Sequence, residues 1–215
     1  YNGGYVLPCA INLGTYFAIR KNNFKKARVY SVQFEEKGLV EFPIDDLKKD
    51  NSWVDYVKGC IKIFDIDFGF DFVCWGTIPH SSGLSSSASF CSGLGFSLTT
   101  LKGTPVSGTK LALECKRIEN EFMGVNCGIM DQFIVCNGKT DMALLLDCNT
   151  LNYQEVPFNL KDQSTNVCYE LVIANTNKKR KLSDSKYNER KAKKKKDVEN
   201  RCTKESIVDS LLSLL

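Results

Sequence analysis

The chain has 215 residues, of which 43% are hydrophobic, and its formal net charge is +4. This length suffices for one large domain, or for one domain and part of another, with an ordinary buried core. No apolar run approaches the roughly 18 to 20 residues that span a bilayer, and the first residues lack the positive region of a secretory signal. We therefore expect a cytoplasmic protein that makes no membrane contacts.

Ten cysteines and a single histidine, His80, are spread along the chain, and no two cysteines form a CxxC pair. This spacing is not that of a zinc site. Most of the cysteines lie among apolar neighbours, as Cys74 does in FVCW and Cys168 does in VCYE. We expect reduced thiols packed in a core rather than disulfides or metal ligands.

The positive charge is concentrated in residues 178–196, KKRKLSDSKYNERKAKKKK, which hold eleven basic and two acidic residues. The rest of the chain keeps 18 of the 29 basic and 23 of the 25 acidic residues. The segment has one aromatic side chain with which to stack on bases, so we expect a solvated basic helix and no nucleic-acid partner. A nuclear-targeting or acidic-partner role is the alternative, and salt-sensitive DNA binding would indicate a nucleic-acid function.

In chain order, residues 6–19 and 27–34 are rich in β-branched and aromatic residues and predict two strands. Turn residues at 21–23 predict a hairpin between them. Residues 52–64, SWVDYVKGCIKIF, place apolar side chains at helical spacing behind Ser52 as an N-cap. In this helix Trp53 and Tyr56 are interpreted first as ordinary core residues. Residues 68–76, FGFDFVCWG, predict a further strand.

The next segment, PHSSGLSSSASF at residues 79–90, has six serines in twelve residues. A flexible linker is one interpretation, but apolar segments bound it on both sides, which is rare for linkers. A strand, this turn and a helix over residues 89–101 would present backbone amides, the positive end of a helix dipole and serine hydroxyls to an anion. No lysine follows a glycine-rich turn, so the segment is not the usual P-loop. From these residues alone, a phosphate site and a purely structural turn both remain open.

Residues 109–123, TKLALECKRIENEFM, predict a second helix that begins at Thr109. One face is apolar, and Glu119 is interpreted as part of the solvated face. The following GVNCGIMDQF places Asp131 among apolar residues and near glycines, where desolvation would make its charge consequential. A helix N-cap or turn aspartate is the alternative, and the residue alone favours it.

The remaining segments predict the start of a second unit. Residues 142–146 and 153–156 read as short strands, and YELVIA at residues 169–174 reads as a buried strand. The tail ESIVDSLLSLL is apolar and needs a surface on which to pack. We therefore expect the sequence to break off inside a second domain.

Taken together, four segments resemble the signatures of the galactokinases, which belong to the GHMP superfamily of small-molecule kinases: GLSSSAS, GVNCGIMDQF, LLDCNTL and SDSKYNER. YNGGYVLPCAINLGTY is similar to the stretch that follows their galactose-recognition motif. The resemblance runs from Tyr1 to about Arg190. It implies an α+β fold of two domains, with residues 1–160 as a mixed sheet flanked by helices and residues 161–215 as an incomplete α/β sandwich.

The resemblance also implies an activity, which is ATP-dependent phosphorylation of the anomeric hydroxyl of galactose to galactose 1-phosphate. The residues that would hold the ATP phosphates are Gly83, Leu84, Ser85, Ser86 and Ser87. Ser87 and Glu119 would be the Mg²⁺ ligands. Trp53 and Tyr56 would line the pocket for the nucleotide base.

At the sugar, the resemblance implies that Asp131 hydrogen-bonds the anomeric hydroxyl and acts as the base or the orienting group. The Gly128 backbone and Tyr187 would also contact galactose. Phosphoryl transfer requires mainly in-line positioning and neutralisation of charge, which amides, a magnesium ion and one carboxylate can supply. We expect galactose and ATP as ligands and a monomer as the default, although the sequence does not give the oligomeric state.

The sequence departs from the family pattern at several points. The motif that supplies an Arg, a Glu, a His and an Asp to the sugar site is expected before Tyr1 and is absent, as is a third, glycine-rich motif. Ser81 stands where the phosphate loop usually has glycine, which matters if that position needs a positive φ. We therefore expect this chain to be weakly active or inactive alone. The alternative function is a non-catalytic galactokinase-like sensor that binds sugar or nucleotide.

Overall fold

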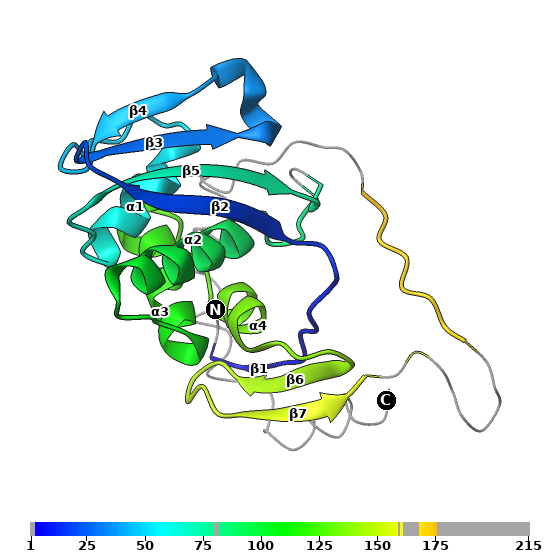
Figure 1. Ribbon diagram of the computed structural model, residues 1–215. Coiled ribbons are helices and arrows are strands. Elements are labelled where there is room, and N and C mark those ends of the chain that lie inside the picture. The colour runs from blue at the N-terminus through cyan, green and yellow to red at the C-terminus, as the bar shows by residue number, and fades with distance from the viewer. Residues whose placement is uncertain (1–2, 80–81, 159, 161–167, 176–215) are drawn as a thin grey trace.

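The computed structural model describes residues 3–79, 82–158, 160 and 168–175. These residues form two β-sheets with helices between them (Figure 1). The strands are β1 (Tyr5–Val6), β2 (Thr15–Asn22), β3 (Lys26–Ser31), β4 (Val40–Pro43), β5 (Gly69–Gly76), β6 (Met142–Asp147) and β7 (Tyr153–Pro157). The helices are α1 (Val54–Ile63), α2 (Ser86–Lys102), α3 (Gly108–Arg117) and α4 (Met130–Asn137), with a 3-10 helix η1 (Val32–Lys37) and a π-helix η2 (Ile118–Met123).

The larger sheet has the order β2-β5-β3-β4 and is mixed. Its centre is β5, which pairs antiparallel with β2 and parallel with β3, so that Phe72 lies opposite both Ile19 and Val29. Burial alternates along β3 and β5, because successive side chains of a strand point to opposite faces. One face of the sheet therefore joins the core.

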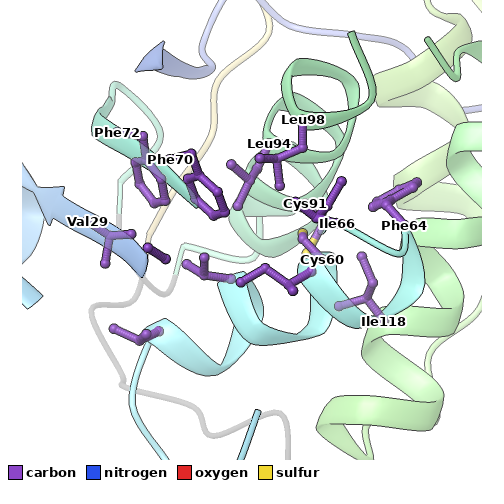
Figure 2. Close-up of a cluster of buried hydrophobic side chains, with 14 of the residues drawn as sticks. Val29, Cys60, Phe64, Ile66, Phe70, Phe72, Cys91, Leu94, Leu98 and Ile118 are labelled. Atoms are coloured by element: carbon purple, nitrogen blue, oxygen red, sulfur yellow. The ribbon is translucent and has the colours of Figure 1, made fainter. Parts of the chain in front are cut away.

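The helices cover that buried face and form the main core (Figure 2). Phe70 and Phe72 of β5 pack with Leu94 and Leu98 of α2, and Cys60 and Cys91 lie in the same cluster. The thiols of Cys60, Cys74, Cys91 and Cys115 are free and buried, as expected, whereas Cys168 is exposed and the expectation for it is wrong. Helix α2 ends at Gly103, whose φ of 87° closes the helix in the left-handed region.

The smaller sheet has the order β1-β6-β7 and is antiparallel throughout. Its buried face carries Leu144 and Leu146, which pack with Phe133 and Ile134 of α4. Helix α4 thus lies between this sheet and the rest of the helical layer (Figure 1). The observed α+β architecture agrees with the expected fold class.

Several predicted elements are confirmed with shifted bounds. The helix predicted over residues 89–101 begins earlier, at Ser86, and the strand predicted over 68–76 is β5. The helix predicted over 109–123 is α3 followed directly by η2, and its N-cap is Ser107 rather than Thr109. The N-cap of α1 is Trp53 rather than Ser52, although the Ser52 hydroxyl accepts a hydrogen bond from the Val54 amide at 3.2 Å.

Other predictions at the N-terminal side are wrong. Residues 6–19 form no single strand, because β1 pairs with β6 in one sheet and β2 pairs with β5 in the other. The strand predicted over 27–34 ends at Ser31, where η1 begins. No hairpin joins β2 to β3, because β5 lies between them.

The segment at residues 169–174 is not a strand in the structure, and it is exposed, with Val172 at 84%. The Tyr169 amide donates to the Leu160 carbonyl at 2.7 Å, but the segment joins neither of the two sheets that the described residues form. The predicted domain boundary near residue 160, the basic segment and the apolar tail fall on or beside residues that the structure does not describe, so they stay predictions. None of the described helices is both long and apolar enough to cross a bilayer.

Candidate active site

The serine-rich segment is a turn that leads from β5 into α2. Ser85 occupies the N-cap position of α2 with a φ of 59°, and Gly83 has a φ of 81°. A left-handed conformation is costly for a residue other than glycine, and such residues are enriched at functional sites as well as in turns. The Leu84 amide donates to Ser82 Oγ at 3.4 Å, so part of the turn is fixed by its own hydroxyls.

The start of α2 is suited to an anion. Ser86 and Ser87 lie in its first turn, whose amides have no carbonyl partner within the helix, and no acidic residue occupies that turn. A Cβ added at Gly83 would meet no atom within 4 Å, so the space beside this glycine is open. These features agree with a phosphate loop and exclude a linker. Ser81 lies outside the described residues.

Glu119 is buried, at 3% exposure, and the interpretation as a solvated helix residue is wrong. It lies in η2, the π-helical segment that follows α3; such segments are rare and frequent at functional sites. Burial raises the pKa of the Glu119 carboxyl, while hydrogen bonds from Ser87 and Gln132 act in the opposite direction. Ser87 and Glu119, which the resemblance assigns together as the Mg²⁺ ligands, therefore influence each other across α2 and η2.

Asp131 is the second residue of α4 and is half-buried, so it is not the helix N-cap. The next residue of α4, Gln132, donates to Glu119 Oε1 at 3.2 Å, so Asp131 belongs to the helical turn that contacts Glu119. Three elements, α2, η2 and α4, thus contribute Ser87, Glu119 and Asp131 to one region. No group of three or more His, Cys, Asp or Glu residues suited to a metal occurs in the described ranges.

The turn between η2 and α4 carries Gly128 and is held by side chains. Asn120 Oδ1 accepts hydrogen bonds from the Cys127 amide at 3.0 Å and from its thiol at 3.2 Å. Gln132 Nε2 donates to Glu119 Oε1 at 3.2 Å and lies 3.6 Å from Cys127 Sγ. Sequence reasoning missed Asn120, Cys127 and Gln132, although the last two lie inside the quoted GVNCGIMDQF segment.

Trp53 and Tyr56 lie in an aromatic cluster beside α2. The Trp53 ring stacks on Phe34 with centroids 6.0 Å apart and meets Phe90 of α2 edge-on at 6.2 Å. Tyr56 meets Phe90 at 6.4 Å, and burial raises the pKa of its hydroxyl, with a further contribution from the charge of Glu119. Both residues therefore pack against the core, as their first interpretation held, and their role at a nucleotide base stays a prediction.

Two concave regions lie away from this site. One, of about 580 Å³, is lined by the loop at residues 9–13 and by apolar residues of 168–173, and the other lies on the open face of the larger sheet. Neither includes residues 82–87. Tyr187 lies outside the described residues, so its assignment to the sugar stays a prediction.

Comparison with known proteins identifies two family models in the chain. The GHMP kinases N terminal domain matches residues 55–139, which include the serine turn, Glu119 and Asp131. The galactokinase galactose-binding signature matches residues 1–21.

Curated relatives of high similarity are galactokinases. That of Clostridium acetobutylicum is 46% identical over 199 residues, which is 89% of this chain and 50% of the relative. That of Fusobacterium nucleatum is 48% identical over 198 residues, again 89% of this chain and 49% of the relative. The chain therefore spans about half the length of the curated relatives that it matches.

Solved structures support the same relationship. Lactococcus lactis galactokinase complexed with galactose matches with a TM-score of 0.81 and 43% identity, over 89% of this chain and 50% of that one. Methanococcus jannaschii mevalonate kinase has a TM-score of 0.60 at 18% identity, over 74% of this chain and 52% of that one, and shows the fold alone.

Proposed function

Because this chain belongs with the galactokinases of the GHMP kinase superfamily, we propose that the protein that carries it phosphorylates galactose at the anomeric hydroxyl, using ATP. The observation that carries this proposal is the convergence of Ser87, Glu119 and Asp131 from three separate elements. The galactose-bound Lactococcus lactis relative supports the choice of sugar. The products would be ADP and galactose 1-phosphate.

We assign the phosphate groups of ATP to the turn and first helical residues that precede and open α2, namely Gly83, Leu84, Ser85, Ser86 and Ser87. Amides at a helix N-terminus stabilise negative charge, and three hydroxyls add donors. Trp53 and Tyr56 would border the base, since both contact Phe90 of α2.

The donor set fits a magnesium ion. Magnesium prefers oxygen ligands and is usually held by one or two carboxylates together with substrate phosphates, and Ser87 with Glu119 offers a hydroxyl and a buried carboxylate beside the phosphate turn. When bound, the ion would neutralise charge on the phosphates. Glu119 would supply the negative charge that keeps the ion at this position.

Asp131 would act on the sugar. Its carboxylate would accept a hydrogen bond from the anomeric hydroxyl, orient the oxygen toward the γ-phosphorus and take up the proton as the new O–P bond forms. The bond from phosphorus to the β,γ-bridging oxygen breaks, and ADP leaves with that electron pair. Gly128 and Tyr187 would complete the sugar contacts.

We also propose that the protein works in the cytoplasm. All nine cysteines that the structure describes are free thiols, which a reducing compartment maintains.

The test measures galactose-dependent ADP release by the full protein that carries this sequence. The unchanged protein is compared with its Asp131→Asn variant. We expect turnover in the unchanged protein and a loss of at least about 100-fold in the variant, the size typical of a lost general base. Asp67→Asn removes an exposed carboxylate and should leave turnover unchanged. Galactose-induced thermal stabilisation without turnover would instead favour the non-catalytic sensor.

A further inference from the structure

Gln132 of α4 is a buried side chain that the mechanism above does not use. Its exposure is 2%, and it lies next to Asp131 in the sequence. Its amide Nε2 donates to Glu119 Oε1 at 3.2 Å and contacts Cys127 Sγ at 3.6 Å. One side chain therefore touches both the carboxylate assigned to the metal and the turn that carries Gly128.

The other end of this amide has no partner. Gln132 Oε1 is buried, and no hydrogen-bond donor reaches it from the residues that the structure describes. A buried acceptor without a donor costs stability, whereas an apolar side chain of the same shape would avoid that cost. The unpaired Oε1 therefore gives no reason for an amide here, whereas the Nε2 contacts with Glu119 and Cys127 do.

We propose that Gln132 is a positioning residue for the metal and phosphate site, a role that rests on the proposed kinase function. The Nε2–H bond fixes one oxygen of the Glu119 carboxylate, so that the group has one orientation beside Ser87. Partners that orient a metal ligand typically change metal affinity or activity by about 10- to 100-fold when they are removed. The contact with Cys127 ties the same amide to the turn on the sugar side.

The decisive variant is Gln132→Met, which keeps the length of the side chain and removes both the amide donor and the unpaired acceptor. The matched control is Asn137→Ala, also on α4, where the amide donates to the Phe133 carbonyl at 2.9 Å and touches neither Glu119 nor Cys127. The probe is Mn²⁺, whose electron paramagnetic resonance signal measures its binding to the full protein in the presence of ATP. Thermal melting of each variant is measured in parallel.

We expect Gln132→Met to weaken Mn²⁺ binding by about 10-fold or more. Its melting temperature should change little, because removal of the unpaired Oε1 offsets the loss of the donor to the buried Glu119 Oε1. Asn137→Ala should lower the melting temperature and leave Mn²⁺ binding unchanged. A role limited to packing would leave Mn²⁺ binding unchanged in Gln132→Met, as in Asn137→Ala, and this outcome separates the two interpretations.

Three results would overturn the role. They are unchanged Mn²⁺ binding in Gln132→Met, an equal loss in Asn137→Ala, and no Mn²⁺ binding by the unchanged protein with ATP. If Gln132→Met does not fold, Gln132→Asn, whose amide is too short to reach Glu119, is expected to show the same loss of binding. Since the readout is binding, a failure of galactose phosphorylation would be seen separately, in the ADP-release assay.

Discussion

At the scale of single residues, Asp71 of β5 makes the densest set of polar contacts outside the candidate active site. Arg28 Nε donates to Asp71 Oδ1 at 2.7 Å and Arg28 Nη2 donates to Oδ2 at 2.8 Å, while Asn22 and Arg20 also donate to this carboxylate. These bonds, those from Arg28 first, hold the pKa of Asp71 well below its usual range. One carboxylate on the central strand thus connects the two strands on either side.

We expect Asp71→Asn to destabilise the protein by about 1 kcal/mol at pH 7, since the network is partly exposed. The folded-state pKa is depressed, so this stabilisation is present above the unfolded pKa of about 4 and is lost as the pH falls through the folded value. Urea unfolding at pH 7 and at pH 3 measures this contribution. The difference in free energy of unfolding between the unchanged protein and the variant should be smaller at pH 3 than at pH 7. A larger difference in free energy of unfolding at pH 3 would contradict a stabilising role for the Asp71 network. An equal difference for the exposed Asp67→Asn variant would contradict it as well.

At the candidate active site, the sequence indicated which residues to examine but not how buried they are or what they contact. The resemblance assigned roles to Ser87, Glu119 and Asp131, and in the structure Ser87 and Asp131 both influence the pKa of Glu119; their roles stay predictions. The burial of Glu119 was missed, because a π-helical segment breaks the 3.6-residue period from which helix faces are read. Gln132 was missed because its partner, Glu119, is remote in sequence, and a pattern search sees residue types rather than contacts.

At the scale of elements, the hairpin predicted between β2 and β3 was wrong, because local sequence signals do not contain the order of strands in a sheet. The turn between β2 and β3 is real, with the Phe24 amide donating to Asn22 Oδ1 at 3.0 Å, but β5 inserts between the two strands. Strand order depends on pairing across more than forty residues, from Asn22 to Gly69, which local composition does not contain. Local alternation and β-branched residues predicted β5, β6 and β7 well, whereas the strands predicted over residues 6–19 and 169–174 were wrong and β4 was not predicted.

Gly69, the first residue of β5, makes this insertion possible. A Cβ at this position would lie 2.8 Å from the Lys25 amide nitrogen and 2.9 Å from that of Lys26, and would collide with the Asn22 side chain. Two of these neighbours are backbone atoms of the turn, so they cannot move aside without opening it. We expect Gly69→Ala to destabilise the protein by about 2 kcal/mol.

The control for this substitution is Gly14→Ala. No atom lies within 4 Å of a Cβ at Gly14, so this variant should lie within about 0.5 kcal/mol of the unchanged protein. Urea denaturation of the two variants side by side measures the difference. Equal stabilities would show that the turn yields and that the order β2-β5-β3 does not depend on a glycine at this place.

At the scale of the whole molecule, the candidate active-site residues that the structure describes come from one part of the chain. The phosphate turn, Glu119, Gln132 and Asp131 all lie within residues 82–137. The chain spans about half the length of its curated relatives, and the apolar residues of 169–173 are exposed beside a cavity lined by the loop at 9–13. The sequence predicted a second unit beginning in this region, and the strand assigned to it joins neither sheet of the described residues.

We therefore expect the 215-residue chain alone to show weak or no galactose-dependent ADP release, even though the phosphate turn and Asp131 are in place. Phosphoryl transfer depends on holding the hydroxyl and the γ-phosphate in line, and a displacement of about 1 Å can reduce the rate 100-fold. The measurement compares ADP release by this chain and by the full protein at equal concentration. Galactose-dependent turnover that persists in this chain and disappears in its Asp131→Asn variant would show that the described half is sufficient for catalysis.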